Sequence, residues 1–453
     1  MEALLQYVWK HKLWPLKPLA TTDGEAVEVI DSGLQNRNAG PDFFNAKVKI
    51  GGTLWVGNVE IHDRAADWNT HGHQRDAAYD NVILHVCSEV NAQAETSAGR
   101  RLPQMQLDVP ATVLQNYRQL LAADRYPPCY QIIPSLSPLI VHSWLSALQT
   151  ERLEQKTEAI RQRVAQCNGS WEQAYFTTLA RNFGFGINGD AFEQWAQNIP
   201  LSAVGHHRDD LFQIEAFFLG QAGLLDLETI PERYHEDALS EGYFARLRNE
   251  YLYLQRKFSL QPIDAKRWRF LRLRPQNFPH VRIAQLAQLY YSQTASLSQI
   301  VACTTAKELE KALDTQATAY WQTHYLFGAA SQKSEKRLSV ASRRLIVINT
   351  VVPMLFAYGR HRRDETLCDR AFSLLEELKA EQNHITRMWG ECGLQAQSAG
   401  DSQALIQLKN EYCDRKDCLR CRIGYEYLKK GSEPSVADRR EAKGSERGVK
   451  GIF

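Results

Sequence analysis

The sequence predicts a mixed α/β module over residues 1–110, followed by a mainly α-helical region over 111–430. Three observations support this division. Short apolar segments typical of β-strands occur before residue 110, and no strand series returns later. Long segments with apolar residues at helical spacing dominate from about residue 112. The last stretch, 431–453, is polar and mixed in charge, which is typical of a disordered tail.

The elements of the α/β module follow one another at short intervals. Residues 2–12 carry apolar side chains at helical spacing, and a short helix is expected near 73–79. The Gly51-Gly52 pair is a hairpin signal between two of the strands. Strands are expected at 26–30, 43–50, 54–62, 82–87 and 105–109. The predicted core is therefore a helix, three strands, a helix and a strand.

Composition restricts the class of protein. The chain has 453 residues, enough for two or three domains, and its 54 basic and 52 acidic side chains give a net charge of +2. Any nucleic-acid-binding surface must therefore be local. We expect no signal peptide and no membrane-spanning helix, although the apolar stretch 345–356 could form a buried helix. Nine cysteines without an export signal favour reduced thiols and a cytoplasmic location.

One predicted strand carries three polar side chains on a single face. Along 54–62, Asn58, Glu60 and His62 share a face because strand side chains alternate. Asp42 starts the preceding strand, and the hairpin brings it near Glu60. Two carboxylates brought together need a cation between them, or one of them takes up a proton. Such oxygen ligands suit Mg²⁺ or Mn²⁺, which lowers the pKa of a bound water and stabilises charge on a phosphoryl oxygen.

Simpler interpretations exist for the same residues. Asp42 could cap the turn before its strand. Glu60 and His62 could form a surface ion pair on a solvated sheet face. These alternatives require no metal.

A second group of polar residues follows the strand. The spacing His71-x-His73, with Asp76 three residues further on, could form a His/Asp metal site or contact a substrate phosphate. The alternative is an exposed polar loop. His85 lies in a predicted buried strand and is expected to be a hydrogen-bonded core histidine.

Pro41-Asp42, followed by Glu60-Ile61-His62 on the next strand, resembles the signature of the PD-(D/E)xK nuclease superfamily. The predicted order of elements is similar to the restriction-endonuclease-like core of that superfamily. The resemblance implies that Asp42 and Glu60 bind Mg²⁺ and that the Ile61 carbonyl adds a ligand. It also implies that His62 positions or deprotonates the attacking water.

The chain departs from the superfamily pattern at one position. Members usually have Lys where this chain has His62. A neutral histidine can act as a base near pH 7, and Lys47 or Lys49 could supply a displaced ammonium. The departure also supports an inactive relative of the fold.

The whole chain further resembles a bacterial family catalogued only as a domain of unknown function. The stretches that carry the resemblance are AGPDFFNAKVKIGGTLWVGNVEIH, EAFFLGQAGLL, RLRPQNFPHVRIAQLA and DSQALIQLKNEYCDRKDCLRCRIG. The match is expected to run from the N-terminus to about residue 430. It implies that these segments form one unit, without an assigned activity.

A basic segment lies in the helical region. Residues 266–282 include six basic and no acidic side chains, with aromatic residues between them. Arginine forks match phosphate geometry, so this segment could grip a nucleic-acid backbone. The alternative is a helix end whose arginines pair with acidic helices. The candidate substrate-binding residues are Asn58, His71, His73, Arg272, Arg274 and Arg282.

Three cysteines cluster near the C-terminus as Cys413-x4-Cys418-x2-Cys421. This spacing can supply three ligands to Zn²⁺ or to a [4Fe–4S] cluster, with Cys392 as the best candidate for the fourth and His384 behind it. The arrangement is similar to iron–sulfur loops of some DNA-repair glycosylases and to Cys clusters of certain PD-(D/E)xK nucleases, which implies a structural or DNA-holding role. The alternative is a set of reduced, partly buried thiols.

These features predict a Mg²⁺-dependent nuclease or nuclease-like DNA-processing protein that hydrolyses phosphodiester bonds, with Asp42, Glu60 and His62 as its catalytic residues. One alternative is a noncatalytic nucleic-acid-binding or scaffold protein on a decayed nuclease fold. Another is a His/Asp metallohydrolase acting on a small phosphorylated substrate.

Overall fold

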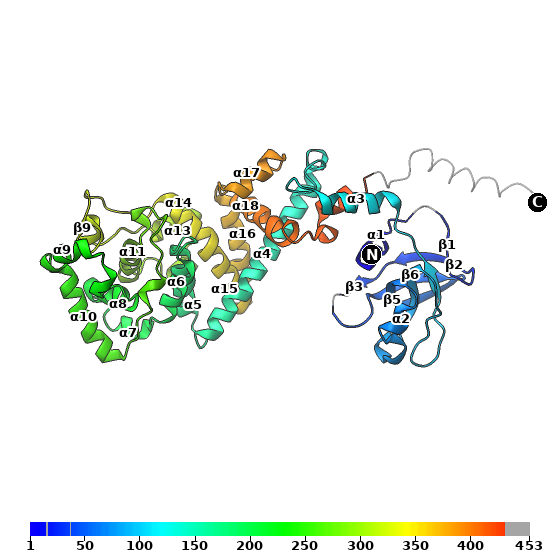
Figure 1. Cartoon of the computed structure of the whole chain (residues 1–453), viewed down its shortest axis with the longest axis horizontal. Coiled ribbons are helices and arrows are strands. Elements are labelled where there is room, and N and C mark those ends of the chain that lie inside the picture. The colour runs from blue at the N-terminus through cyan, green and yellow to red at the C-terminus, as the bar shows by residue number, and fades with distance from the viewer. Residues whose placement is uncertain (15–16, 37, 431–453) are drawn as a thin grey trace, which may run out of the picture. The chain divides into compact units, whose positions relative to one another are not determined.

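A computed structural model describes residues 1–14, 17–36 and 38–430 (Figure 1). The chain forms two compact units. Of the described residues, the first contains Met1–His142, Cys392–Leu394 and 408–430, and the second contains Ser143–Glu391 and Gln395–Gln407. The tail that the sequence predicts to be disordered, 431–453, lies outside the described residues.

The first unit is α/β and is built on one seven-stranded sheet with the order β1-β2-β4-β5-β6-β7, in which β3 pairs with β4. From β1 to β5 the neighbours are antiparallel, whereas β5, β6 and β7 are parallel. Helix α1 (Glu2–His11) contacts β5. The strands are β1 (Leu19–Ala20), β2 (Ala26–Asp31), β3 (Leu34–Gln35), β4 (Phe43–Ile50), β5 (Thr53–Arg64), β6 (Val82–Glu89) and β7 (Gln104–Gln106).

The sequence explains why these strands form where they do. Gly51 and Gly52 both have positive φ, of 54° and 88°, and make the tight turn between β4 and β5. The first six residues of β6, VILHVC, are all buried, as expected for a strand with a parallel neighbour on each side. In β5, Val59, Glu60, Ile61 and His62 are all buried, so both faces of the strand are covered there.

The prediction of one short helix near 73–79 is wrong, because two separate 3₁₀ turns occupy this stretch. The connection between β5 and β6 contains one helical turn, α2 (Asp67–Thr70), and two 3₁₀ turns, His73–Arg75 and Ala77–Tyr79. Gly72, with φ of 81°, ends the first turn, and extended Asp76 separates the two others. A continuous helix cannot form across two such breaks.

The second unit is a helical assembly around a large apolar core that includes Trp195, Phe217, Leu247, Val281 and Trp321. One short hairpin, β8 (His324–Leu326) with β9 (Ala329–Ala330), is inserted in it. The helices are α4 (Pro138–Gln166), which starts in the first unit, α5 (Trp171–Phe183), α6 (Gly189–Gln197), α7 (Leu201–Gly205), α8 (Leu211–Gln221), α9 (His235–Ser240), α10 (Tyr243–Phe258), α11 (Pro279–Ser292), α12 (Leu297–Ala302), α13 (Ala306–Ala312), α14 (Val340–Ile346), α15 (Val352–Arg362), α16 (Glu365–Glu377), α17 (His384–Glu391) and α18 (Ala399–Gln407).

The apolar stretch 345–356 is helical, as the sequence suggested. It runs through α14, a π-helical turn (Val347–Val351) and α15. The span Val340–Arg362 is long and apolar enough to cross a membrane by those criteria alone, but most of it is buried inside the second unit. This burial is typical of a core helix.

The chain returns to the first unit at its C-terminal end. A π-helical segment (Leu408–Cys413), a 3₁₀ turn (Cys418–Arg420) and α19 (Arg422–Leu428) belong to this unit, and α19 contacts α3 (Ala111–Ala122). The Asn116 amide on α3 donates to the carbonyls of Tyr427 and Leu428 at 3.3 and 3.2 Å. The first unit therefore extends past the boundary at residue 110 that the sequence suggested.

Candidate metal centre

Asp42 and Glu60 lie side by side, as the hairpin argument predicts. Asp42 immediately precedes β4, and Glu60 lies on β5. The Glu60 Oε2 atom accepts a hydrogen bond from the Asp42 backbone N–H at 3.0 Å. In return, the Asp42 Oδ2 atom accepts from the Ile61 backbone N–H at 3.0 Å. The backbone of each segment therefore holds the carboxylate of the other.

Burial gives this pair of carboxylates unusual acid–base properties. Burial first, and then the nearby Glu60, raises the pKa of Asp42 to about 8. Two residues of α1 face the same site. Gln6 donates to Asp42 Oδ1 at 2.9 Å, and the pKa of Glu2 is raised by burial and by Asp63 and Glu60. Sequence reasoning missed Glu2 and Gln6, although their i, i+4 spacing places them on one face of the helix.

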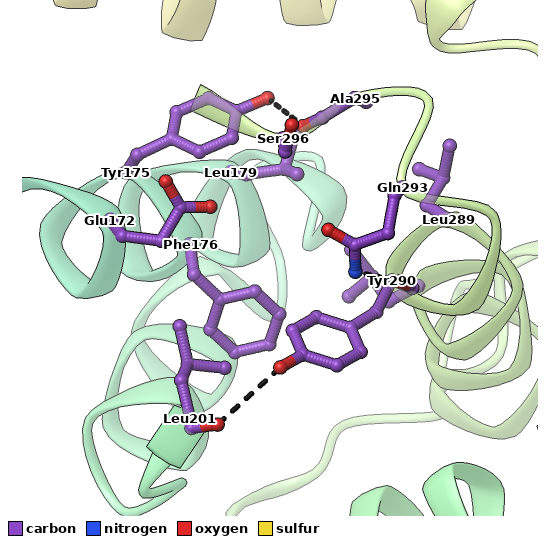
Figure 2. A pocket seen from close by; sticks show the side chains of 11 residues that line it. Glu172, Tyr175, Phe176, Leu179, Leu201, Leu289, Tyr290, Gln293, Ala295 and Ser296 are labelled. Atoms are coloured by element: carbon purple, nitrogen blue, oxygen red, sulfur yellow. Dashed lines mark hydrogen bonds between the residues drawn. The ribbon is translucent and has the colours of Figure 1, made fainter. Parts of the chain in front are cut away.

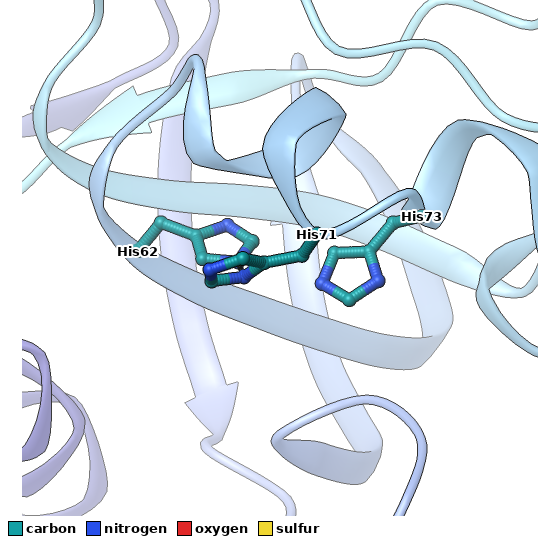
Figure 3. Close-up of side chains that lie close together, drawn as sticks. All are labelled: His62, His71 and His73. Atoms are coloured by element: carbon teal, nitrogen blue, oxygen red, sulfur yellow. Dashed lines mark hydrogen bonds between the residues drawn. The ribbon is translucent and has the colours of Figure 1, made fainter.

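Three histidines of the first unit, His62, His71 and His73, lie close together (Figure 3). One ring nitrogen from each of His62, His71 and His73 lies within 4.8 Å of the others. The Glu60 Oε1 atom lies 3.4 Å from His73 Nε2 and 3.6 Å from His62 Nε2. Among the described residues, no other group of three or more His, Cys, Asp or Glu has its ligand atoms this close together. A carboxylate and three imidazoles at such distances can form a metal site.

The structure changes the composition of the His/Asp site that the sequence suggested. His71 and His73 do converge, but their neighbour is His62 and not Asp76. The Asp76 carboxylate instead accepts from the Ala78 backbone N–H at 2.9 Å and caps a 3₁₀ turn. His73 is buried and stacks on the Tyr79 ring at 3.8 Å between centroids, which fixes its orientation.

A buried chain of hydrogen bonds behind the site sets the tautomer of His62. The Gln104 amide on β7 donates to the Ala92 carbonyl at 3.0 Å, and its oxygen accepts from the Ala94 N–H at 3.3 Å. These two bonds fix the amide nitrogen toward His85 Nδ1, at 3.3 Å. His85 Nδ1 is then an acceptor, so its proton is on Nε2, which faces His62 Nδ1 at 2.9 Å. We infer that neutral His62 carries its proton on Nε2, toward Glu60 and His71.

Burial also keeps both histidines neutral. It lowers the pKa of His62 to about 4, with smaller contributions from His73 and His71. It lowers the pKa of His85 to about 3, with His62 as the next cause. At neutral pH, His62 therefore presents a neutral N–H donor to the site.

Other residues predicted for this site lie elsewhere. Asn58 accepts from the Asn45 backbone N–H at 3.4 Å, at an irregularity in the β4–β5 pairing, and no described contact links it to the histidines. Lys47 and Lys49 are exposed and pair with Val56 and Leu54, toward the hairpin turn. Neither lysine is therefore placed to replace the missing ammonium.

Comparison with known proteins gives a family but no activity. The family described as "Protein of unknown function (DUF2851)" matches residues 2–384. The chain belongs to the DUF2851 family. The matched part contains the whole metal centre, and it ends before the residue near 430 at which the sequence suggested an end. Searches of curated proteins and of solved structures each found no match.

The C-terminal cysteines of this DUF2851 chain lie beyond the matched range and gather around a cysteine within it. Cys129, Cys413 and Cys421 are buried, and Cys418 is half-buried. Burial raises the pKa of the Cys129 thiol, and electrostatic repulsion from the nearby thiolates of Cys421, Cys413 and Cys418 raises it further. Cys392, the predicted fourth ligand, is also buried.

Hydrogen bonds hold the two cysteine-bearing segments together. The Tyr126 hydroxyl donates to the Asp414 carboxylate at 2.8 Å. Tyr126 lies three residues before Cys129, and Asp414 directly follows Cys413. Lys416 donates to the Leu121 carbonyl at 2.9 Å. These contacts place the four thiols in one region of the first unit.

Two cavities of the DUF2851 chain belong to the second unit, whereas the candidate metal centre belongs to the first. One of them, between α5 and α11 in the second unit, is lined by Tyr175, Phe176 and Tyr290 (Figure 2). Its volume of about 30 Å³ leaves room for about one water molecule. A second cavity in this unit contains Arg272, Arg274 and Arg282 in its wall.

Proposed function

We propose that the first unit is a metal-dependent phosphodiesterase site, of a nuclease or a nuclease-like DNA-processing protein. The observation that carries the proposal is the reciprocal contact of Asp42 and Glu60, with three imidazoles beside Glu60. A divalent cation bound there relieves the repulsion that raises the pKa of Asp42. The antiparallel strands followed by parallel β6 also support the resemblance to the PD-(D/E)xK superfamily.

In this proposal, Asp42 and Glu60 are the metal ligands. Oxygen ligands alone suit Mg²⁺, but His73 Nε2 lies 3.4 Å from Glu60 Oε1 and can add a nitrogen. A mixed set of oxygen and nitrogen ligands favours Mn²⁺ over Mg²⁺. The ion would lower the pKa of a bound water and stabilise charge on the phosphoryl group.

His62 acts as a hydrogen-bond donor in this proposal. Its low pKa makes it a weak base at neutral pH, and its Nε2 proton points into the site. It can orient an attacking water or donate to a phosphoryl oxygen, as the lysine of the superfamily would. The tautomer set by Gln104 and His85 makes this role the preferred one.

Cleavage assays test this function directly. We expect Mn²⁺-dependent hydrolysis of DNA or of a phosphodiester substrate by the full chain. The double variant Asp42→Asn, Glu60→Gln should lose it, and the control Asp76→Asn should keep it because the Asp76 carboxylate caps a 3₁₀ turn. If the wild-type chain hydrolyses none of several single- and double-stranded nucleic acids with Mn²⁺ or Mg²⁺, the proposal is wrong.

The alternative is a noncatalytic nucleic-acid-binding or scaffold protein on a decayed nuclease fold. Its support is His62 in place of Lys and the connection between β5 and β6, which has only one helical turn. Binding without cleavage, with a steep dependence on salt, would favour it. A small-molecule metallohydrolase that uses His62, His71 and His73 would instead cleave phosphorylated small molecules and ignore nucleic acids. All three functions agree with reduced cysteines and a cytoplasmic location.

We also propose that Cys129 completes the C-terminal cysteine site. Tetrahedral zinc holds thiolate sulfurs about 3.8 Å apart, given Zn–S bonds of about 2.3 Å. Among the described residues, no three cysteine sulfurs lie within 4.8 Å of one another. We propose a [4Fe–4S] cluster as the content of this site, in which each thiolate binds a different iron.

A further inference from the structure

A cavity in the second unit has a wall of positive charge. Its volume is about 550 Å³, within the range of small-molecule sites. Five basic side chains line it, and no acidic side chain is among the described residues of its wall. The basic residues are Arg272, Arg274, Arg282, Lys336 and Arg337.

Arg282 lines this cavity, and its charge has no acidic partner among the described residues. It is 6% exposed. Its guanidinium donates to Gln285 Oε1 at 2.9 Å and to Asn277 Oδ1 at 2.6 Å, and lies over the Phe185 ring at 4.6 Å. All of these partners are neutral. Its buried Nε has no hydrogen-bond partner among the described residues.

The buried charge of Arg282 destabilises the protein when no anion is bound. A buried charge needs a paired charge or a complete set of hydrogen bonds. Burial lowers the pKa of Arg282 to about 10, and it is the sole cause of the shift. A bound anion would stabilise the charged form of the Arg282 guanidinium.

The remaining cations of the wall differ in how far they are neutralised. Arg337 pairs with Asp314 at 2.8 Å and with Glu335 at 3.3 Å. Lys336 is buried and donates to neutral oxygens, including the Trp321 and His324 carbonyls. Arg272 and Arg274 are exposed and form no ion pair within the described part of the chain. Four cations therefore remain without a carboxylate partner among the described residues. Three of them, Arg272, Arg274 and Arg282, come from the segment 266–282, and they do not pair with acidic helices as the alternative for that segment expected.

We propose that this cavity binds the phosphate groups of a nucleotide-sized ligand. Arginine forks match phosphate oxygens with two parallel hydrogen bonds. Several unpaired cations in one cavity suit a multiply charged anion better than a single carboxylate. The volume leaves room for an organic body beside the phosphates. The ligand is either a free nucleotide or the phosphorylated end of a nucleic-acid strand.

Calorimetric titration of the full chain tests the proposal. The probes are pyrophosphate, ADP without metal, a 5′-phosphorylated oligonucleotide, its 5′-hydroxyl counterpart and succinate. We expect one pyrophosphate or ADP bound per chain and much weaker binding of succinate. Tighter binding of the 5′-phosphorylated strand than of its 5′-hydroxyl counterpart would identify a strand end as the source; equal weak binding of both would identify a free nucleotide.

Three variants separate recognition from folding. Arg282→Gln should weaken pyrophosphate binding by about 30-fold or more, because a buried charged partner is lost. Arg274→Gln, at an exposed residue without an ion pair, should weaken it by about fivefold and still fold. Arg256→Gln, an exposed change of equal charge on α10, should leave it unchanged.

Three results would overturn the proposal: no saturable phosphate binding by the wild type, unchanged affinity in Arg274→Gln, or succinate binding equal to pyrophosphate. If Arg282→Gln fails to fold, Arg274→Gln still decides. The Asp42→Asn, Glu60→Gln variant should bind pyrophosphate as the wild type does. A failure of the metal site and a failure of this cavity are thus distinguishable.

Discussion

The side-chain amide nitrogen of Gln104 lies 3.3 Å from His85 Nδ1 and determines which nitrogen of His85 carries the proton. The His85 Nε2–H then donates to His62 Nδ1 at 2.9 Å, so the proton of neutral His62 is on Nε2. A residue on β7 thus controls the proton that His62 presents to the candidate metal centre on β5. We expect a single substitution at Gln104 to reverse this relation.

Gln104→Glu should invert the tautomers. A carboxylate accepts from the His85 Nδ1–H, which leaves His85 Nε2 as the acceptor and moves the His62 proton to Nδ1. Nitrogen NMR of the imidazole rings should show Nε2–H in the wild type and Nδ1–H in the variant. Phosphodiester hydrolysis should fall by ~10²-fold, as for loss of one positioned donor. Gln93→Glu, an exposed change nearby, is the control, and an unchanged His62 tautomer in Gln104→Glu would refute the relay.

Titration of His62, His85 and Asp42 should give the first unit a maximum in its free energy of unfolding near pH 6.5. The pKa values of His62 and His85 are lowered from 6.5 to about 4 and about 3. Acidification below 6.5 therefore protonates the unfolded chain first and destabilises the fold, by about 1.4 kcal/mol per pH unit for each histidine. Asp42 acts in the opposite sense, because its pKa is raised from 3.8 to about 8 and the fold loses stability as pH rises through that range.

Between pH 4 and 6.5 the two histidines outweigh Asp42, and of these three groups only Asp42 contributes from pH 6.5 to about 8. Hydrogen exchange of β5 and β6 amides in the full chain, corrected for intrinsic rates, measures this profile. Asp42→Asn should flatten the alkaline side and steepen the acidic side, because Asp42 opposes the two histidines between pH 4 and 6.5. Stability that rises steadily from pH 4 to 8.5 in the wild type would contradict the assigned shifts.

Binding of Mn²⁺ should release a proton from Asp42. At pH 7 the metal-free carboxyl is largely protonated because its pKa is about 8, and a ligand must be deprotonated. Calorimetry in two buffers of different ionisation enthalpy should give about one proton released per ion at pH 7 and about none at pH 9.5. Asp42→Asn should bind Mn²⁺ ~10²-fold more weakly and release no proton. Binding without proton release by the wild type at pH 7 would contradict the raised pKa of Asp42.

The fourth ligand of the cysteine site can be identified by metal analysis. Anaerobically purified chain should contain about four iron atoms and four sulfides. Cys129→Ser should lose them, whereas Cys392→Ser, and Cys303→Ser as a control in the second unit, should retain them. Iron retained in Cys129→Ser but lost in Cys392→Ser would restore the assignment made from the sequence. One zinc per chain would exclude the cluster.

The sequence predicts the pairing of Asp42 and Glu60 well, because strand alternation and a glycine hairpin determine it locally. It also predicts the α/β and helical regions and the buried helix at 345–356. The helix near 73–79 is wrong since Gly72 and Asp76 break it. The role of Gln104 depends on the register between parallel strands β6 and β7, which periodicity does not give.

Contacts between distant segments account for the other omissions. Cys129 meets the C-terminal cysteines because the chain returns to the first unit after the helical region. The burial of Arg282 depends on how α11 packs in the second unit, so its spacing from Arg272 and Arg274 did not reveal it. Residues close in space but far apart in sequence leave no periodic signal.

Anomalous diffraction from crystals soaked in Mn²⁺ tests the metal centre most directly. We predict a single strong peak in the first unit, at bonding distance from one oxygen of Asp42 and one of Glu60. The peak should vanish in crystals of the Asp42→Asn, Glu60→Gln variant. A map without a peak between these carboxylates, or with one bound by the histidines alone, would contradict the proposed site.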